Sequence, residues 1–263
     1  MSAFQGSPEW LAQRAGRITG SRVASALGIC KYATRDDLMR EMVREHFAAE
    51  REFTGNEATE HGQAHEDDAI DLYEQQTGQG ILYTGQHIHP ELDWLAASPD
   101  GLVGSEGLIE VKCPYRGTYT TAADVPHYIA QMQLQMAVTG RKWCDFVIWR
   151  NDSILIDRVD AEPFWLDERM PTLQAFIDDY RATIASEELS ARHLMPLIRE
   201  DKEWTKAERN YLLAKKEADE AALVLEEAKA ELIALAGEQS QKGRAVQVIR
   251  SERKGSVAYA KAI

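Results

Sequence analysis

The sequence predicts an α/β fold in which helices flank a central mixed β-sheet, with a long helix appended after it. Helical and strand-like periodicities of apolar residues alternate over the first part of the chain, which is typical of this class. Turn residues separate several short strand-like runs between residues 81 and 113, as in a sheet built from short strands. A continuous stretch rich in alanine, glutamate, lysine and leucine then runs from Glu203 to Ala236.

The elements before the sheet are expected to be helices. The stretch SPEWLAQRAGRITGSRVASALG predicts a short helix, a turn at residues 19–21 and a second helix with Ser21 as its N-cap. A third helix, from about Ala64 to Gln76, is followed by Gly78, a typical stop. The apolar face of this helix is formed by Ala69, Leu72 and Tyr73.

Strands of the sheet are predicted near residues 81–83, 94–98 and 108–113, separated by turns at residues 84–85, 90, 100–101 and 104. A helix over 126–138 precedes two further strands, 143–149 and 154–159, which Asn151 and Asp152 connect. Pro163 opens another helix that reaches about Glu187.

The stretch Glu203–Ala236 predicts one long helix that ends at Gly237. Leu225 and Leu232 are one heptad apart, and Ala218 and Leu235 extend the seam, which is too short to predict a coiled coil. We expect this helix to pack on its own domain or on a neighbouring subunit.

The tail after this helix alternates like a strand at residues 245–249 and is basic, with Lys242, Arg244, Arg250, Arg253, Lys254 and Lys261. Basic runs are often only solvated. The tail therefore either contacts nucleic-acid phosphates or offsets the acidic helix before it.

The net charge of the 263 residues is −13, which by itself argues against nucleic-acid binding because phosphate contacts favour a basic surface. The charge is unevenly distributed, however, since residues 56–110 contain no lysine or arginine. The same segment contains twelve acids: Glu57, Glu60, Glu66, Asp67, Asp68, Asp71, Glu74, Glu91, Asp93, Asp100, Glu106 and Glu110. Most of them are explained by a solvated acidic face, but a bound divalent metal would let such a segment approach phosphate.

Cysteine usage and hydropathy indicate a cytoplasmic protein without a membrane segment. No apolar run is long enough to cross a membrane, and the first ten residues lack the pattern of a secretory signal. Cys30, Cys113 and Cys144 form no C-x-x-C pair, which indicates reduced thiols and argues against a four-cysteine iron–sulfur cluster.

The segment SPDGLVGSEGLIEVKCPY holds the strongest candidate site. Asp100 follows a predicted strand at a Pro-Asp-Gly turn, and Glu110 and Lys112 lie two residues apart on the next strand. A period of two puts Glu110 and Lys112 on one strand face, while Ile109 and Val111 point into apolar packing. Pairing of the adjacent strands would bring Asp100 beside Glu110.

Two carboxylates and one ammonium suit phosphodiester hydrolysis. Carboxylate oxygens bind Mg²⁺, which polarises a phosphate and lowers the pKa of a bound water. A lysine can orient that water or stabilise the charge of the transition state. A Glu-x-Lys pair alone is more often a surface ion pair, but here Pro99-Asp100 upstream completes the pattern PD-(x9)-E-x-K.

With this pattern the chain resembles the PD-(D/E)XK nuclease superfamily, and more narrowly the family of phage lambda exonuclease and the YqaJ-type viral recombinases. Five segments carry the resemblance in order and spacing: WLAQRAGRITGS (Trp10–Ser21), HGQAHEDDA (His61–Ala69), SPDGL (Ser98–Leu102), IEVKCP (Ile109–Pro114) and YIAQMQ (Tyr128–Gln133). The resemblance implies a restriction-endonuclease-like exonuclease domain over residues 1–198. Residues 199–263 extend beyond the family's span as a long helix and a basic tail.

The resemblance also implies a role for each matching residue. Two Mg²⁺ ions, for which Mn²⁺ would substitute, would be held by Asp100, Glu110, the Val111 carbonyl and Glu66. Lys112 would position or activate the attacking water, and Gln131 would support that water or the scissile phosphate. A terminal 5′-phosphate would be held by Arg14, Ser21 and Ser98. Tyr128 lies on one polar helical stripe with Gln131 and Gln135 and is assigned to DNA contact.

Two other chemistries compete for these segments. His61 and His65 are one helical turn apart, a spacing that can bind zinc, but neither an HExxH order nor a compelling third ligand accompanies them. We therefore expect this helix to contribute Glu66 to a Mg²⁺ site rather than His61 and His65 to a zinc site. Cys113 has no His-paired cysteine signature around it and is expected to be a packing residue rather than a nucleophile.

The function implied by the resemblance is that of a phage- or prophage-encoded, magnesium-dependent 5′-to-3′ exonuclease. It would digest one strand of linear double-stranded DNA and leave 3′ overhangs for homologous recombination. The implied partners are DNA ends, a single-strand annealing protein and further copies of the chain in a homo-oligomer, which is a trimeric ring in relatives. Two alternatives stay open: a structure- or sequence-specific endonuclease on the same fold, and a non-catalytic DNA-binding or scaffold subunit.

Overall fold

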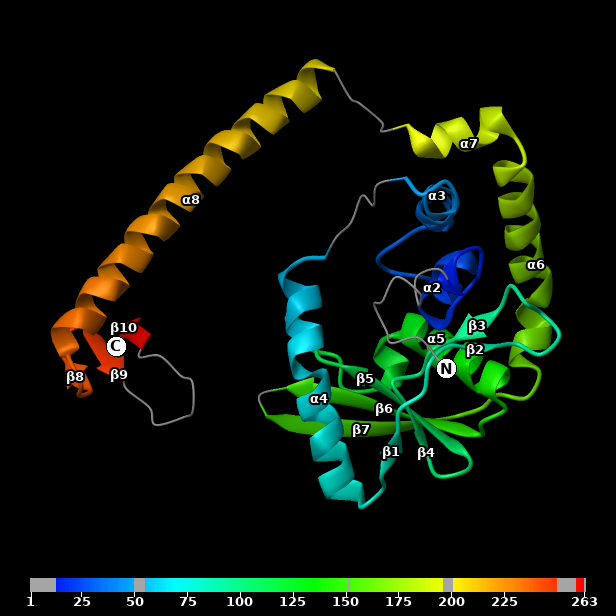
Figure 1. The fold of residues 1–263 in the computed structure, drawn as a ribbon, viewed down its shortest axis with the longest axis horizontal. Helices are drawn as coiled ribbons and strands as arrows, with labels where there is room; N and C mark the ends of the chain where they lie inside the picture. Colours follow the sequence, from blue (N-terminus) through cyan, green and yellow to red (C-terminus); the bar gives the residue numbers. More distant parts are fainter. Residues whose placement is uncertain (1–12, 50–54, 151, 196–200, 250–258, 263) are drawn as a thin grey trace. The chain divides into compact units, whose positions relative to one another are not determined.

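The chain divides into two compact units, Met1–Pro196 and Leu197–Ile263. The computed structural model describes residues 13–49, 55–150, 152–195, 201–249 and 259–262 (Figure 1). In the first unit helices flank a five-stranded sheet, and in the second a long helix is followed by three short strands. The predicted fold class, a mixed sheet flanked by helices with a helical extension, is confirmed.

The central sheet of the first unit has the strand order β1–β4–β5–β6–β7. The strands are β1 (Ile81–Leu82), β4 (Gly101–Val103), β5 (Gly107–Lys112), β6 (Trp143–Arg150) and β7 (Ser153–Asp160). β5 and β6 are parallel and are connected through helix α5 (Pro126–Thr139), whereas the other neighbours are antiparallel. The sheet is therefore mixed, and β5 is its central strand.

Helices cover both faces of this sheet (Figure 1). Ile109 and Val111 of β5 pack with α4 (Glu57–Thr77), through Ala69, Ile70 and Tyr73. Leu108 of β5 packs on the other face with Met132 and Met136 of α5. The predicted alternation of side chains along β5 is confirmed, because Glu110 and Lys112 share the face of Leu108 and contact α5.

A third group of helices packs against the outer side of α5. It comprises α2 (Gly20–Ala26), α3 (Arg35–His46) and α6 (Trp165–Ile184), which share one apolar core with α5. α7 (Glu187–Leu194) follows α6 and contacts α3. This arrangement brings the residues around α2 next to the sheet face that carries Glu110.

Local signals explain where the helices that frame the sheet begin and end. Asn56 caps α4, because its side chain accepts hydrogen bonds from two backbone N–H groups at 3.1 Å. Pro126 occupies the first turn of α5, where no backbone donor is needed. Gly78 and Gly140 end the two helices with φ of 69° each, a conformation that favours glycine.

The expected strand pairing around Asp100 is wrong. The partner of β5 is β4, which starts at Gly101, and the strand predicted near residues 94–98 is reduced to β3 (Ala96–Ala97), paired with β2 (His87–Ile88). Gly101 is the first residue of β4 rather than a turn residue. Glycine is needed there because a Cβ would lie 2.2 Å from the Ile81 side chain. The turn between the paired strands is at Gly104, with φ of 51°.

Several helices also differ from expectation, and α4 begins at Glu57 rather than near Ala64. Ser21 is not an N-cap, because α2 begins at Gly20 with Thr19 at the cap position. The helix predicted from Pro163 to Glu187 is divided: α6 ends at Ile184, and Ser186 caps α7 by accepting a bond from the Leu189 N–H at 3.3 Å. α3 was not predicted, although Thr34 and Asp37 form a capping box at its start.

Some expected features lie outside the described residues. These are most of the first predicted helix, before residue 13, the turn residue Asn151, and the basic residues Arg250, Arg253 and Lys254 of the tail.

The second unit consists of α8 (Lys202–Ala236), β8 (Gln241–Lys242), β9 (Val246–Ile249) and β10 (Tyr259–Ala262). The long helix predicted over Glu203–Ala236 is confirmed, including its end at Gly237. Val248 of β9 packs with Ala236 and Ile233 of the helix. Across the described parts of both units, the search for a helix with the length and hydropathy of a membrane span finds none.

A buried polar network ties α4 to the sheet. Asp145 of β6, 2% exposed, accepts a hydrogen bond from the Tyr73 hydroxyl of α4 at 2.7 Å. Arg158 of β7 donates to both oxygens of the same carboxylate, at 2.7 and 2.8 Å. Since a buried carboxylate must be paired and hydrogen-bonded, these contacts fix the position of α4, which also carries Glu66.

Tyr73→Phe should therefore lower the free energy of unfolding by about 1–3 kcal/mol, the cost of removing a donor from a buried acceptor. Urea denaturation at neutral pH measures this loss. Tyr83→Phe is the matched control, because the Tyr83 side chain is 62% exposed and its substitution should change little. An unfolding free energy for Tyr73→Phe equal to that of the wild type would mean that Arg158 alone satisfies Asp145.

Candidate active site

Asp100 and Glu110 meet across the β4–β5 pair. The register pairs Gly101 with Ile109, so one further step puts Asp100 opposite Glu110. Asp100 Oδ2 accepts a hydrogen bond from the Val111 N–H at 2.7 Å, which holds this side chain against the end of β5. The two carboxylates, ten positions apart in the pattern but adjacent in space, thus form one site.

The Glu110 carboxylate is 1% exposed and is surrounded by donors. Gln131 Nε2 of α5 donates to Oε1 at 2.6 Å, and Gln135 Nε2 donates to Oε2 at 2.7 Å. Lys112 Nζ also donates to Oε1. Because residues 131 and 135 are one helical turn apart, α5 presents both amides to the same carboxylate.

The electrostatics of the site reflect two acids in a confined volume. Burial and the nearby Glu110 charge raise the pKa of Asp100 well above its usual range. Burial alone would lower the pKa of Lys112, but Glu110 and Asp100 outweigh it and raise that pKa. Burial also raises the pKa of Glu66, and repulsion from Glu110 adds to it, although Lys112 opposes the change. The ammonium of Lys112 is therefore the local counter-charge.

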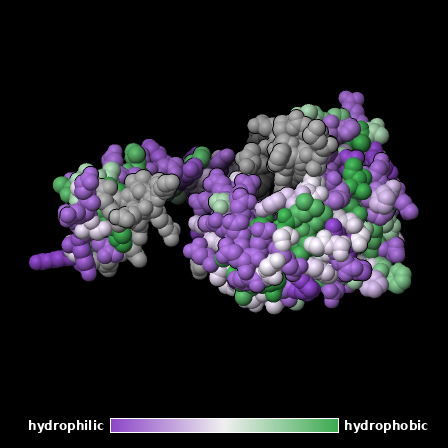
Figure 2. Space-filling model, turned by 60° about the horizontal axis from the view of Figure 1, so that its bottom comes forward, coloured by the Kyte–Doolittle hydropathy of each residue, from purple (hydrophilic) through white to green (hydrophobic). Residues whose placement is uncertain are grey.

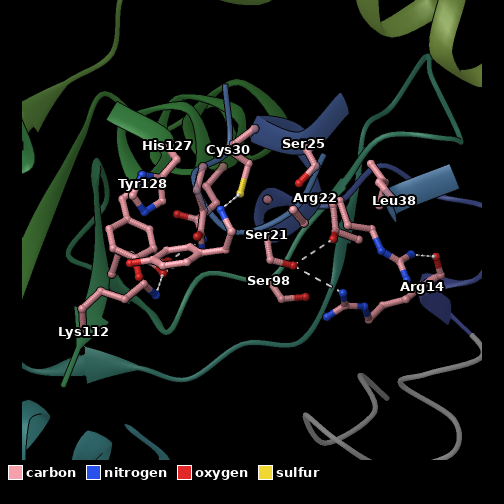
Figure 3. A pocket seen from close by; sticks show the side chains of 18 of the residues that line it. Arg14, Ser21, Arg22, Ser25, Cys30, Leu38, Ser98, Lys112, His127 and Tyr128 are labelled. Atoms are coloured by element: carbon pink, nitrogen blue, oxygen red, sulfur yellow. Dashed lines mark hydrogen bonds and ion pairs between the residues drawn. The ribbon is translucent and has the colours of Figure 1, made fainter. Parts of the chain in front are cut away.

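One cavity of about 450 Å³ contains every residue that the sequence assigned to the site. These residues are Asp100, Glu110, Val111, Lys112, Gln131, Glu66, Arg14, Ser21, Ser98 and Tyr128. Figure 3 shows Lys112 and Tyr128 at one end of this cavity, with the Lys112 ammonium 5.0 Å from the Tyr128 ring centroid. Arg14, Ser21 and Ser98 gather at the other end (Figure 3).

The arginine end of the cavity is organised by short contacts. Arg14 donates to the Ser21 hydroxyl at 3.3 Å, and the Thr19 hydroxyl is also 3.3 Å from that oxygen. Arg22, 3% exposed, donates to the Arg14 and Arg17 carbonyls at 3.2 Å each. This end combines a guanidinium with hydroxyl groups, a set that suits a phosphate.

Arg22 is itself held by two acids of α3. Its guanidinium lies 2.6 Å from Glu41 and 2.7 Å from Glu45. Burial would lower its pKa, but the two carboxylates together raise it. A buried arginine paired in this way is rigid, so it fixes the backbone that carries Arg14.

The carboxylate end provides the oxygen ligands that a magnesium ion would need. Asp100, Glu110 and the Val111 carbonyl supply oxygen atoms, the ligands that Mg²⁺ prefers. Lys112 Nζ donates both to Glu110 and, at 3.2 Å, to the Val111 carbonyl, so a cationic group already bridges two of these oxygens. In the described residues no three His, Cys, Asp or Glu side chains gather closely enough to enclose an ion. A set of two carboxylates and one carbonyl fits Mg²⁺, which keeps several waters.

The competing chemistries receive no support from the contacts. His65 stacks on Trp149 with ring centroids 4.0 Å apart, and its Nδ1 lies 3.2 Å from Asp68. His65 of the competing zinc pair is thus engaged in ring packing and in a surface contact. Burial raises the pKa of Cys113 to about 12, which keeps this thiol protonated and unreactive at neutral pH.

Three residues without a predicted role belong to the site. Gln135 had been placed on the polar stripe of α5, which was a usable signal, and its Oε1 has no hydrogen-bond partner among the described residues. His127 lines the cavity with an unpartnered Nε2 in the same part of the chain, and burial lowers its pKa. Arg22 had no sequence signal, because only the packing of α3 reveals its acidic partners.

Comparisons with known proteins agree on one family. Residues 9–142 match the model of the YqaJ-like viral recombinase domain. An alkaline exonuclease (LHK-Exo) from Laribacter hongkongensis is 34% identical, and the match covers 72% of this chain and 100% of that chain with a TM-score of 0.61. The same enzyme in complex with dAMP gives 33% identity, the same coverage and a TM-score of 0.61.

A phage-related exonuclease from Haemophilus somnus shares the fold at 18% identity, over 64% of this chain and 95% of that chain, with a TM-score of 0.53. The search of curated protein sequences finds no match. The family model spans more than half of the 263 residues, and the Laribacter hongkongensis enzyme is matched over its whole length. The chain therefore belongs to the YqaJ-like viral recombinase family.

Proposed function

We propose that this protein is a Mg²⁺-dependent exonuclease that degrades one strand of linear double-stranded DNA from its 5′ end. The observation that carries the proposal is the arrangement of a single cavity, with a carboxylate–lysine cluster at one end and an arginine–serine cluster at the other. Membership of a family whose solved relatives are exonucleases supports it. The product would be a 3′ overhang for a single-strand annealing protein of a phage or prophage in the host cytoplasm.

The size of the cavity supports action on a strand end. About 450 Å³ is the volume of a pocket for a small-molecule ligand, so it has room for a terminal nucleotide rather than for a duplex. The related Laribacter hongkongensis enzyme has been solved in complex with dAMP, a mononucleotide. Release of mononucleotides from an end is the reaction that such a cavity suits.

The contacts of these residues support the following proposed roles. Asp100, Glu110 and the Val111 carbonyl would hold Mg²⁺, with Glu66 toward a second ion, and Mn²⁺ would substitute. Bound metal would supply the acidity that turns water into a nucleophile and would neutralise phosphate charge. Gln131 and Gln135 keep the Glu110 carboxylate in place. Lys112, which donates to Glu110 in this structure, would donate instead to the attacking water or to the phosphate oxygens when substrate is bound.

The arginine end would select the substrate. Arg14 would pair with a terminal 5′-phosphate, which carries more negative charge than an internal diester, and Ser21 and Ser98 would add hydroxyl donors. Tyr128, beside Lys112, would contact the nucleotide. Arg22 would stabilise this arrangement, because its guanidinium donates a hydrogen bond to the backbone carbonyl of Arg14.

An endonuclease on the same fold is the second candidate, because the carboxylate–lysine cluster alone does not require a strand end. The two functions differ on closed circular duplex DNA, which only an endonuclease cuts. A ring of subunits around DNA, expected from relatives, would also favour ends, and it remains part of this proposal.

The first prediction from this assignment concerns the metal. Asp100→Asn and Glu110→Gln should reduce hydrolysis to background, because each removes a charged ligand, and excess chelator should do the same to the wild type. Lys112→Ala should bind Mg²⁺ and DNA normally yet hydrolyse about 10²- to 10⁴-fold more slowly. Metal binding is followed by calorimetry and turnover by release of nucleotides.

The matched control is Glu106→Gln, on the turn before β5, where the side chain only forms a surface pair with Lys142. It should leave metal binding and turnover unchanged. Wild-type rates in excess chelator, or near-normal turnover by Asp100→Asn, would remove the two-carboxylate assignment.

The second prediction concerns Gln135 as a positioning residue. Gln135→Leu removes the donor to Glu110 Oε2, so the carboxylate should be less well oriented and the half-saturating Mg²⁺ concentration should rise by about 10- to 100-fold. Saturating Mg²⁺ should restore much of the turnover. Gln174→Leu is the control with the same substitution, because this half-buried glutamine of α6 donates only to the Asp178 side chain of its own helix among the described contacts and does not line the cavity. An unaltered Mg²⁺ titration of Gln135→Leu would show that Gln131 and Lys112 suffice.

The third prediction concerns the 5′ end. Wild type should digest linear duplexes with 5′-phosphate faster than those with 5′-hydroxyl and should leave closed circles intact. Arg14→Ala should reduce this preference by roughly ten- to a hundred-fold, since a hydrogen bond to a charged group contributes about 1.5–3 kcal/mol. Its metal binding should not change. Arg192→Ala, an exposed arginine paired with Glu188 and outside the cavity, should behave as wild type.

Equal wild-type rates on the two kinds of end would exclude the 5′-phosphate pocket. Cutting of closed circles would favour the endonuclease. No hydrolysis of any duplex with Mg²⁺ present would favour a non-catalytic DNA-binding subunit.

A further inference from the structure

Helix α8 carries an apolar seam along its whole length. In heptad notation its a positions are Trp204, Tyr211, Ala218, Leu225 and Leu232, and its d positions are Ala207, Ala214, Ala221, Ala228 and Leu235. All ten are exposed, and within α8, which is described from end to end, only Ala236 is buried. The surface of the second unit in Figure 2 accordingly shows hydrophobic side chains among hydrophilic ones. When Trp204, Tyr211 and the alanines are counted, the seam is longer than the four residues considered from the sequence alone, and five uninterrupted heptads are typical of a coiled coil.

We propose that α8 pairs with α8 of a second copy of this chain in an antiparallel two-stranded coiled coil. The side-chain sizes favour this orientation. Four of the five d positions are alanine, whereas four of the five a positions are large. In a parallel pair a meets a and d meets d, so crowded layers would alternate with empty ones. In an antiparallel pair a meets d, so three of the four large a residues lie opposite an alanine, as good packing requires.

A single register gives every a position a d position of the second copy as its partner. When Leu225 lies opposite Ala214 of the second copy, Leu232 lies opposite Ala207 and Tyr211 opposite Ala228. The same register puts Ala218 opposite Ala221 at the centre and Trp204 opposite Leu235 at the ends. The two helices therefore overlap over their full length, with no apolar layer left unmatched.

The charges beside the seam agree with the same orientation. In the antiparallel register Glu208 of one copy lies near Lys229 of the second, and the symmetry repeats this opposite-charge pair. A parallel pair would instead put Glu203 near Glu208 of the second copy, and like charges at these flanking positions disfavour association. Leu212, Leu213 and Leu223 are also exposed on α8 but lie outside the seam.

Zero-length carbodiimide cross-linking of the full chain tests the orientation. Glu208 and Lys229 are about 31 Å apart within one helix, at 1.5 Å per residue, so a direct amide between them can form only between two copies. Glu226 and Lys229, 2.6 Å apart in the same helix, provide an internal positive control. A mixture of isotopically light and heavy protein should give the Glu208–Lys229 cross-link in mixed-label form.

A matched pair of variants tests the seam itself. Ala221→Glu places a charge in the central layer, whereas Ala230→Glu makes the same change at an exposed position outside the seam. Analytical ultracentrifugation of the full chain should give half of the wild-type mass for Ala221→Glu and the full wild-type mass for Ala230→Glu. If the first unit also associates, for example as a ring, the mass of Ala221→Glu should fall to that of the assembly that the first unit forms by itself.

Three results would overturn the proposal. One is formation of the Glu226–Lys229 cross-link without the Glu208–Lys229 cross-link. Another is an unchanged mass for Ala221→Glu. The third is a set of cross-links from the seam to residues of the first unit of the same chain, which would make that unit the occupant.

Discussion

Burial of the Glu110 carboxylate beside Asp100 is the constraint on which the arrangement of the first unit depends. An acid that is 1% exposed costs several kcal/mol unless donors and counter-charge surround it. β5 supplies Lys112 from its own face, and α5 supplies two glutamines from the facing helix. The crossover from β5 through α5 to β6 is thus what brings the donors to the acid. Two acids that repel each other are also a natural place for a divalent cation.

The distribution of cationic groups explains how an acidic chain can act on a phosphate. The net charge is −13, and a uniformly acidic surface would repel DNA. In the cavity, however, Lys112 lies among the carboxylates, and Arg14 lies at the opposite end over a backbone fixed by Arg22. In the proposed function, attraction of phosphate would therefore be local and would depend on a few side chains, each of which is held by contacts to other elements.

The two units are stabilised by different means. In the first, strands and helices bury one another, and polar groups such as Asp145 are satisfied inside. In the second, a helix of 35 residues buries only Ala236. Helices in proteins owe most of their stability to packing of an apolar face, so this helix has a large surface whose burial would stabilise it. Its regular spacing of large and small residues makes a second copy of the same helix the matching surface.

The sequence by itself determined the fold class and the long helix, and the residues it proposed for the site all line one cavity. Period-two alternation placed Glu110 and Lys112 on one face of β5, and glycines and a proline set the ends of α4 and α5. Order and spacing of five segments indicated the family that the comparisons confirm. These features are local or follow a regular period, so neighbouring residues are enough to specify them.

Only the tertiary structure decided which strand pairs with β5, why Gly101 is glycine and how Arg22 is buried. Each of these depends on residues distant in sequence: Ile81 against Gly101, and Glu41 and Glu45 against Arg22. It also decided that the carboxylate end and the arginine end share one cavity. Close approach of a side chain from another element and the pairing of buried charges leave no periodic trace in the sequence, because they arise only when separate elements pack together.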